Sequence, residues 1–359
     1  MNNKTLFDFD DLLIEPASTS VINSRSQTLP FYEEFVEQGV YNKKLPLMTA
    51  PMDTVISTEN IKYFSDLGIT PVLPRVKNPT NSYVSHEYFL SYSLTDFNKI
   101  FLDNTVDVDN GDQIYVLIDM ANGHMSNLLT STNKAKIKYG DKMVLMVGNV
   151  ANPDTFNILS LTNVDYIRIG IGNGGGCLTT VQTGVGYPMA SLISSCYKIK
   201  KNNPLIKTKI VADGGFKNYS DVIKALALGA DYVMLGSIFN KSLESCGETT
   251  KVNGYLREVV DQYSKESLDM FNVDIPLYKV FRGMSTKEVQ KSWGIEDLKT
   301  SEGVVREVKV EYTLKGWVDN FTSYLKSAMS YTNKKTLHQF VGGVSYNLIS
   351  RSSYERFNK

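Results

Sequence analysis

The sequence predicts an α/β protein of the (β/α)8 barrel class, and three observations support this class. Short apolar segments of strand length alternate along the chain with longer amphipathic segments. The apolar segments are continuous, which is typical of parallel strands that are covered on both faces. About eight such units fit into the chain, and eight parallel strands close more readily into a barrel than into an open sheet. We therefore expect one barrel domain.

The predicted strands and helices follow one another in the order that this fold requires. The strands are Leu45–Thr49, Thr70–Leu73, Ile114–Ile118, Met143–Val147, Tyr166–Ile169, Lys209–Ala212, Tyr232–Leu235 and, as a weaker candidate for the eighth, Tyr278–Phe281. The helices between them are Asn60–Leu67, Met125–Tyr139, Pro153–Leu161, Met189–Lys200 and Ser220–Gly229.

Three segments depart from the even spacing of the units. Pro74 to Gly111 is a polar, tyrosine-rich connection, and Thr249 to Pro276 is a charged segment that we expect to form a solvated helical excursion. The tail from Val318 to Lys359 is rich in Ser, Tyr, Asn and Lys. Residues 1–359 are thus predicted to form a single barrel domain with an N-terminal extension, an excursion near 249–276 and a C-terminal tail.

The composition excludes several classes of function. Lys and Arg together number 38, as do Asp and Glu, so the chain has no net charge to attract a nucleic acid. No apolar run approaches the ~18 residues of a membrane span. The three cysteines are widely spaced and predict no disulfide framework, which fits a reducing cytoplasm. We expect a cytoplasmic protein with no nucleic-acid or membrane partner.

The most informative segment is a glycine-rich loop around a single cysteine, Cys177. Five glycines lie between Gly170 and Gly176, directly after the apolar run Val164–Ile169. Glycine lets a backbone approach a ligand closely. A cysteine at the C-terminal end of a barrel strand is a candidate nucleophile. The alternative is a glycine-rich turn that carries a small buried thiol, and the loop alone favours neither interpretation.

Two later strand ends carry a pattern typical of phosphate binding. The strand Ile210–Ala212 ends in Asp213-Gly214-Gly215, and the strand Ala230–Leu235 ends in Gly236-Ser237. Backbone N–H groups at such ends point toward an anion, and the missing side chains of glycine leave room for it. We expect a phosphate group to bind there.

With these motifs in order, the chain resembles the IMP dehydrogenase / GMP reductase family from Phe7 to about Tyr331. The stretches that carry the resemblance, besides the cysteine loop and the two strand ends, are Phe7–Pro16, Pro46–Val55, Ile118–His124, Val147–Val150, Tyr278–Ser285 and Ser301–Gly303. Each stretch is a weak signal alone, and their common order makes the signal specific.

The resemblance implies roles for the catalytic candidates. Cys177 matches the cysteine that adds to C2 of a purine nucleotide, and Thr179 matches its helper threonine. Glu302 matches an acidic residue near the purine that moves a proton, although without the motif it would be one more surface glutamate. Asp119 matches a carboxylate on the nicotinamide side of the site, with the alternative that it caps the following helix.

The resemblance also implies which residues bind each group. The purine nucleoside monophosphate would contact Met52, Asp213, Gly215, Gly236, Ser237, Gly283, Met284, Ser285 and Gly303, with Asp213 on the ribose and Met52 on the purine. The cofactor, NADPH or else NAD, would contact Asp119, Asn149 and Arg168. A monovalent cation such as K+ would bind backbone carbonyls at Gly172, Gly174 and Cys177. A homotetramer is expected.

Within the family, the sequence favours the reductase over the dehydrogenase. Dehydrogenases of this family have a mobile flap whose Arg-Tyr pair activates a water molecule. The corresponding segment of this chain, Ser285–Ser301, contains neither arginine nor tyrosine. Dehydrogenases of the family usually carry a regulatory pair of CBS modules inserted in the barrel, and the connection Pro74 to Gly111 is too short to contain it. Against the reductase, Ala50–Asp53 and Leu235–Ser237 are more similar to dehydrogenases. We expect NADPH-dependent reductive deamination of GMP, or a close analogue, to IMP. The alternatives are an IMP dehydrogenase that forms XMP with NAD, a flavin-dependent barrel and a non-catalytic nucleotide-binding barrel.

Several positions depart from the family pattern. Glycine at 175 replaces a serine whose hydroxyl would contact the phosphate, and Leu178 stands where threonine is usual. Lys299 replaces an arginine near the purine, and Ser327–Asn333 lacks an arginine that binds the cofactor. These departures leave open whether the substrate is a ribo- or deoxyribonucleotide and whether the cofactor carries a 2′-phosphate.

Overall fold

The computed structural model describes residues 5–36, 40–109, 111–284, 286–292 and 303–357. Eight parallel strands form one sheet in the order β4-β11-β10-β9-β8-β7-β6-β5. The two ends of the sheet meet through a parallel bridge between Met48 and Thr70, so the sheet closes into a barrel. The strands are β4 (Leu47–Thr49), β5 (Val72–Leu73), β6 (Phe89–Tyr92), β7 (Ile114–Asp119), β8 (Met143–Val150), β9 (Tyr166–Ile169), β10 (Lys209–Asp213) and β11 (Tyr232–Leu235).

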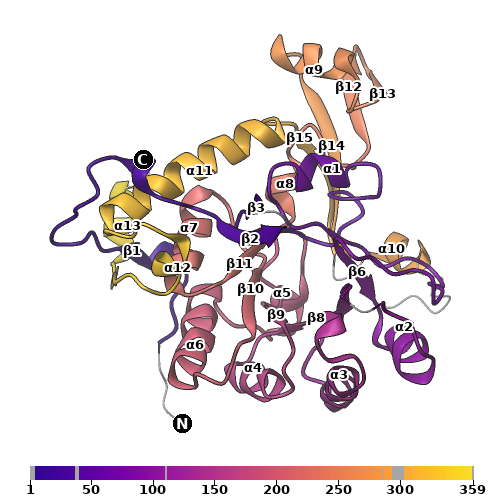
Figure 1. The fold of residues 1–359 in the computed structure, drawn as a ribbon. Coiled ribbons are helices and arrows are strands. Elements are labelled where there is room, and N and C mark those ends of the chain that lie inside the picture. The colour runs from indigo at the N-terminus through magenta and orange to yellow at the C-terminus, as the bar shows by residue number, and fades with distance from the viewer. Residues whose placement is uncertain (1–4, 37–39, 110, 285, 293–302, 358–359) are drawn as a thin grey trace.

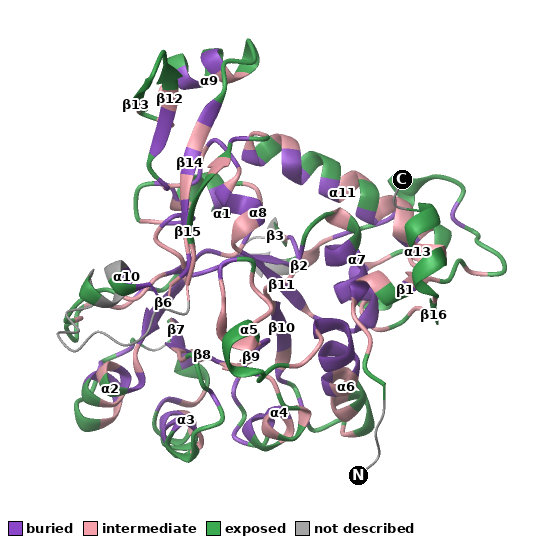
Figure 2. Ribbon diagram, turned by 180° about the vertical axis from the view of Figure 1, so that it is seen from behind, coloured by how far each residue is buried: buried purple, intermediate pink, exposed green. Residues whose placement is uncertain are grey.

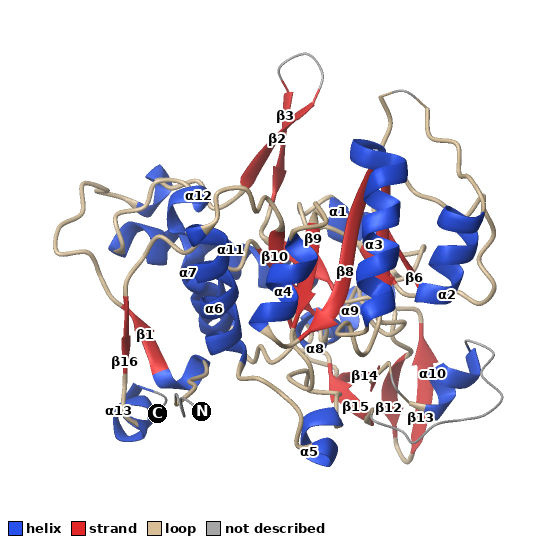
Figure 3. Ribbon diagram, turned by 90° about the horizontal axis from the view of Figure 1, so that it is seen from below, coloured by secondary structure: helices blue, strands red, loops and turns tan. Residues whose placement is uncertain are grey.

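Helices surround the barrel, which Figure 1 shows approximately along its axis and Figure 3 from the side. Local sequence fixes where they begin: Asn152 caps α4 and is followed by proline at the first helical position, and Asn218 caps α7. The helices that alternate with the strands are α1 (Ile61–Ser65), α2 (Leu94–Phe97) with its continuation η4 (Asn98–Asp103), α3 (Ser126–Tyr139), α4 (Pro153–Ser160), α6 (Met189–Asn202), α7 (Tyr219–Leu228) and α11 (Leu314–Tyr331).

The hydrophobic core has two layers, and the strands of the barrel are mostly buried, as Figure 2 shows. Inside the barrel, side chains of alternate strand positions form one cluster that includes Met48, Phe89, Leu117, Met146 and Met234. The opposite faces of the strands pack on the helices and form the larger cluster. Each side chain of this size contributes about 1.5–3 kcal/mol when it is fully buried. The barrel is therefore rigid enough to position loops at its carboxyl edge.

Seven of the predicted strands are confirmed as strands of the barrel. The eighth candidate, Tyr278–Phe281, does form a strand, but its assignment to the barrel is wrong. The missing barrel strand is β6, which lies inside the segment that we interpreted as a polar connection. Its four residues are all buried, including Ser91, whose hydroxyl donates to the carbonyl of Leu73. A satisfied hydroxyl is compatible with burial, but it interrupts the apolar pattern on which the prediction depended.

The segment Tyr278–Phe281 belongs instead to a second, antiparallel sheet, ordered β13-β12-β14-β15. Its strands are β12 (Thr249–Asn253), β13 (Leu256–Val260), β14 (Leu277–Arg282) and β15 (Val305–Lys309). Figure 1 shows β12, β13 and α9 (Lys265–Asn272) projecting from the barrel. The predicted helical excursion at 249–276 is thus a hairpin followed by one short helix. Gly254, at φ +60°, and Tyr255 form the two-residue turn between the paired residues Asn253 and Leu256.

The N-terminal extension and the C-terminal tail lie together. Strand β1 (Leu12–Ile14) pairs antiparallel with β16 (Tyr346–Leu348), and α13 (Arg351–Phe357) follows. A second hairpin of β2 (Tyr32–Val36) and β3 (Val40–Lys44) projects from the amino end of the barrel, on the opposite side from the antiparallel sheet (Figure 3). The remaining short elements are η1 (Phe9–Asp11), η2 (Arg25–Gln27), η5 (Gly140–Lys142), α5 (Thr179–Thr183), α8 (Ser237–Asn240), α10 (Lys287–Ser292) and α12 (Leu337–Phe340). Among the described helices, none combines the length and apolarity needed to cross a membrane.

Candidate active site

A cavity of about 770 Å³ opens at the carboxyl ends of the barrel strands. The segments that follow β4, β5, β6, β7, β8, β9, β10 and β11 line it, together with the end of β14. This edge of a (β/α)8 barrel is where such proteins bind their ligands. Of the predicted site residues, the lining includes Met52, Asp119, Asn149, Arg168, Gly172, Gly174, Cys177, Thr179, Asp213, Gly215, Gly236, Ser237, Gly283 and Met284.

The cysteine loop presents its thiol to this cavity. Cys177 is half-buried, and its backbone N–H donates to the carbonyl of Gly174 over 2.9 Å. Its Sγ atom lies 3.3 Å from Oγ1 of Thr179, at the start of α5. The two predicted catalytic side chains are therefore in contact. A hydroxyl at this distance can exchange a proton with a thiol or with a group bound beside it.

Glycines bring the neighbouring loops into contact with the cysteine loop. A β-carbon at position 176 would lie 2.7 Å from Cε1 of Phe281, closer than real side chains approach. A β-carbon on Gly214, which has φ +90°, would lie 3.0 Å from the backbone of Gly174. Any larger residue at either position would push the loops apart, so the glycine pattern in the sequence reflects this close packing.

The predicted phosphate end of the cavity is assembled from three loops. Ser237 begins α8, and its Oγ lies 3.9 Å from the point that a β-carbon on Gly175 would occupy. Gly236 is covered by Met52, whose Sδ would lie 2.7 Å from a β-carbon at 236. The predicted residues of this end are thus neighbours in space.

Backbone hydrogen bonds connect the end of β14 to the cysteine loop. The N–H of Val304 donates to the carbonyl of Gly176 over 3.1 Å, and the N–H of Gly283 donates to the carbonyl of Val304 over 2.9 Å. Cys177 and Gly303 also form an antiparallel bridge. Predicted residues Ser285 and Glu302 lie outside the described residues, as does Lys299, and so their positions are not described.

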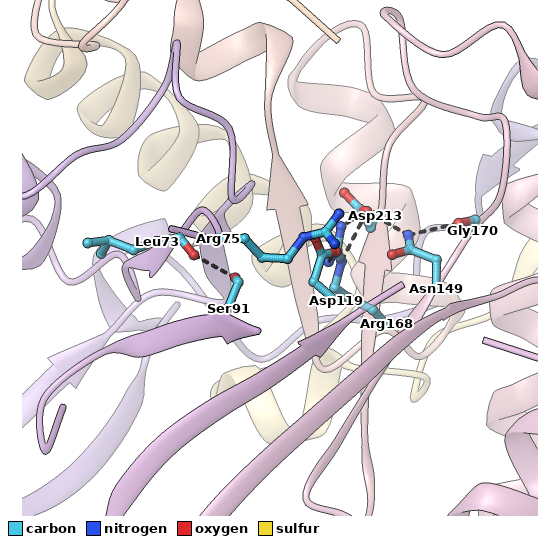
Figure 4. A network of polar contacts seen from close by, with 8 residues as sticks. All are labelled: Leu73, Arg75, Ser91, Asp119, Asn149, Arg168, Gly170 and Asp213. Carbon is cyan, nitrogen blue, oxygen red and sulfur yellow. Dashed lines mark hydrogen bonds and ion pairs between the residues drawn. The ribbon is translucent and has the colours of Figure 1, made fainter. Parts of the chain in front are cut away.

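A network of charged side chains lies at the other end of the cavity (Figure 4). Arg168 reaches from β9 to two carboxylates, with Nη1 2.7 Å from Oδ1 of Asp119 and Nη2 2.9 Å from Oδ2 of Asp213. Arg75 pairs with the other oxygen of Asp119 at 3.1 Å. Asn149 donates to Oδ2 of Asp213 over 2.7 Å and to the carbonyl of Gly170 over 2.9 Å.

The charges in this network balance one another. Burial lowers the pKa of Arg168, but the carboxylates of Asp213 and Asp119 outweigh burial and raise the pKa above its usual value. The guanidinium therefore stays charged, and two arginines face two carboxylates. All the Asp213 bonds within the described residues use Oδ2, which leaves Oδ1 to contact a ligand.

The structure decides one alternative and adds two residues. Helix α3 begins at Ser126 with Met125 as its N-cap, so the interpretation of Asp119 as a helix cap is wrong. Arg75 was not predicted, although a cation two residues after a predicted strand was a signal for the shared carboxyl edge. Arg306, which lies beside Gly175, was not predicted either, because it belongs to none of the motifs described above.

The predicted cation ligands lie in one loop. The carbonyl of Gly174 already accepts the N–H of Cys177 and keeps one lone pair for a second partner. Among the described residues, no cluster of three or more His, Cys, Asp or Glu side chains has the spacing to bind a metal ion. The cation at these backbone carbonyls remains a prediction.

The fold and the site define a class: a (β/α)8 barrel protein with a glycine-lined pocket that contains a cysteine, at the carboxyl ends of its strands. Residues 101–356, more than half of the chain, match the IMP dehydrogenase / GMP reductase domain. The chain belongs to this family, as its motifs predicted.

Relatives from distant organisms align along most of the chain. The GMP reductase of Vibrio vulnificus (strain YJ016) is 26% identical over 98% of this chain and 97% of its own length. The GMP reductase of Aliivibrio salmonicida (strain LFI1238) is 30% identical over 77% of this chain and 81% of its own length. GMP reductase 2 of Mus musculus is 25% identical over 94% of this chain and 93% of its own length.

Proposed function

We propose that the protein is a GMP reductase-like enzyme that converts GMP, or a close analogue, to IMP and ammonia with oxidation of NADPH. The observation that carries the proposal is the position of Cys177, which contacts Thr179 and lines the same cavity as Gly215, Gly236 and Ser237 and as the ion pair of Arg168 with Asp119. The names of the aligned relatives support the same activity.

The proposed reaction begins with attack of the Cys177 thiolate on C2 of the purine, which forms a C–S bond. The bond from C2 to the exocyclic nitrogen then breaks, and the nitrogen leaves as ammonia after it accepts a proton. We assign Glu302 as the source of this proton, with Thr179 as the relay next to the sulfur. Asp119, Asn149 and Arg168 would hold the nicotinamide cofactor, which would supply the hydride that C2 accepts. The C–S bond then breaks, IMP leaves and the thiolate is regenerated.

The binding roles follow from the two ends of the cavity. Gly215, Gly236 and Ser237 would hold the phosphate, with Gly283, Met284, Ser285 and Gly303 closing the same end. Asp213 would accept hydrogen bonds from the ribose hydroxyls through Oδ1, because Oδ2 is already engaged. Met52 lies over Gly236 and would pack against the purine ring.

The charged end of the cavity fits the nicotinamide of a dinucleotide. The cavity is within the range of about 300–1,000 Å³ that is usual for small-molecule sites, and it extends past Cys177 to Asp119, Asn149 and Arg168. The balanced charges there suit a neutral carboxamide ring better than an anion. We propose NADPH rather than NADH on the family resemblance, and a comparison of kcat/KM for the two cofactors tests this choice.

Four further proposals concern the protein as a whole. We propose a homotetramer in solution, which light scattering after gel filtration tests. We propose that K+ binds at Gly172, Gly174 and Cys177, which activity in KCl against choline chloride tests. We propose a cytoplasmic location, because a catalytic thiol needs a reducing compartment. We also propose that residues 1–359 fold as one domain.

The assay that tests the proposed function follows the absorbance of the reduced nicotinamide in two mixtures. GMP with NADPH should give oxidation of NADPH, and Cys177→Ala should remove it. Faster reduction of NAD with IMP would instead establish the dehydrogenase. Binding of GMP without turnover in either mixture would favour the non-catalytic barrel. A yellow purified protein would favour the flavin-dependent alternative.

A further inference from the structure

One arginine outside the barrel, Arg306, lies beside Gly175, which lines the cavity. It lies on β15 directly opposite Phe281 of β14, and the centre of its guanidinium is 4.9 Å from the centre of the Phe281 ring. Cross-strand contact with an aromatic ring holds a long side chain in one orientation. The ring in turn packs on Gly176, so Arg306 is positioned next to the cysteine loop.

Arg306 and Ser237 converge on the same point beside Gly175. A β-carbon at position 175 would lie 3.5 Å from Nη2 of Arg306 and 3.9 Å from Oγ of Ser237. Glycine leaves this point open. It is also the position where the family usually has a serine that contacts the phosphate. The chain therefore lacks one hydroxyl there and has a guanidinium beside the same space.

The charges around Arg306 leave its guanidinium available for an anion. Among the described carboxylates, none is within ion-pair distance of it. The next residue, Glu307, points to the opposite face of β15 and pairs with Arg257 at 2.6 Å. Arg282, at the end of β14, is paired with Asp53. A phosphate monoester with ~1.5–2 negative charges would be a partner of the kind that the described carboxylates do not supply to Arg306.

We propose that Arg306 binds the 5′-phosphate of the purine nucleotide and replaces the serine contact that Gly175 has lost. The proposal rests on the proposed function, since it assigns one more contact to the same nucleotide. The planar guanidinium can donate two parallel hydrogen bonds to phosphate oxygens, and Ser237 can donate a third. Arg306 is thus a binding residue that sets the preference for a nucleotide over a nucleoside.

The test compares GMP with guanosine, which lacks the phosphate, by calorimetry on the full-length protein. Arg306→Gln should weaken GMP binding roughly tenfold or more, as expected for a lost charge-assisted hydrogen bond, and leave guanosine binding unchanged. Arg306→Lys should keep part of the affinity. The matched control is Arg257→Gln, because Arg257 stacks on Tyr278 in the same sheet.

A second variant makes the test independent of folding defects. Gly175→Ser places a hydroxyl where a β-carbon has only ordinary contacts, and added to Arg306→Gln it should restore part of the GMP affinity. Equal losses for GMP and guanosine in Arg306→Gln, or no loss for GMP, would overturn the proposal for Arg306. If the unaltered protein binds GMP no better than guanosine, the proposed function itself fails.

Discussion

At the scale of single residues, three thiols occupy three different environments. Cys177 lies in the cavity, whereas Cys196 is fully buried in α6 and Cys246 is half-buried beside the carbonyl of Asp53. Burial raises the pKa of Cys196 far above its usual range and raises the pKa of Cys246 to about 12. Neither of these two thiols supplies a thiolate at neutral pH.

We therefore predict that Cys177→Ala abolishes turnover and retains GMP binding. Binding depends mainly on the phosphate and ribose contacts, while covalent chemistry depends on the thiolate. Calorimetry and the nicotinamide assay on the same preparation measure the two properties. Cys246→Ala is the control and should retain activity. Full activity in Cys177→Ala would remove this residue from the mechanism.

The Arg168 network predicts a large effect on stability. Arg168→Met would leave the carboxylates of Asp119 and Asp213 without the cation between them. Removal of one partner from a buried ion pair usually costs about 3–5 kcal/mol. The free energy of unfolding in urea measures the loss. Lys315→Met, which breaks an exposed pair with Asp319, should change it by less than about 1 kcal/mol. Equal effects would show that the network contributes little.

At the scale of elements, the antiparallel sheet β12–β15 packs against the cysteine loop of the candidate site. Strand β14 carries Phe281 on one side of the cysteine loop, and its partner β15 follows Gly303, which bridges to Cys177. Strand β14 also contains Lys279, which is completely buried. Its amine donates to the carbonyl of Ser245 and to the hydroxyl of Thr249, both over 2.7 Å. The sheet therefore contains a buried titratable amine.

Lys279 predicts a pH dependence of stability. Burial lowers its pKa from 10.5 to about 7, although Cys246 and Glu244 oppose this effect. Between these two pH values the unfolded chain binds more protons than the folded chain, so the contribution of Lys279 to stability rises with pH. The stability of the unaltered protein relative to Lys279→Met should rise between pH 7 and 10, by on the order of 1 kcal/mol per pH unit. Urea unfolding across this range measures the difference, and a constant difference would contradict it.

The sequence predicted the elements whose residues repeat one pattern and missed those that depend on distant partners. The continuous apolar runs of β7 to β11 identified barrel strands, and the glycines around Cys177 identified the site. Strand β6 was missed because the buried hydroxyl of Ser91 finds its acceptor on another strand. Strand β14 was wrongly predicted to lie in the barrel. Its residues are buried alternately because it pairs with β12 and β15, and a short apolar run does not show this alternation.

The same limit applies within the site. Asp119, Asn149, Asp213 and Ser237 were found because family motifs contain them. Arg75 reaches the cavity only through the closure of the barrel, and Arg306 lies beside Gly175 only through the pairing of β15 with β14. The two side chains come close to the candidate site only in the folded protein, so their positions along the sequence do not predict this proximity.

At the scale of the whole molecule, the two ends of the chain are connected. Leu12 of β1 is completely buried and pairs with Leu348 of β16, and the N–H of Ile349 donates to the carbonyl of Asp11 over 2.8 Å. We predict that far-UV circular dichroism and tryptophan fluorescence report one coincident thermal transition, as for a single cooperative unit. Two separated transitions would contradict the proposed single domain.

The central claim is that hydride reaches C2 of a purine attached to Cys177. The most direct measurement uses NADPH with deuterium at both C4 positions of the reduced nicotinamide, incubated with GMP, followed by mass spectrometry and proton NMR of the nucleotide product. The account predicts IMP with one deuterium at C2, formed in equal amount to the ammonia released, and none with Cys177→Ala. Product IMP without deuterium, or XMP as the product, would contradict it.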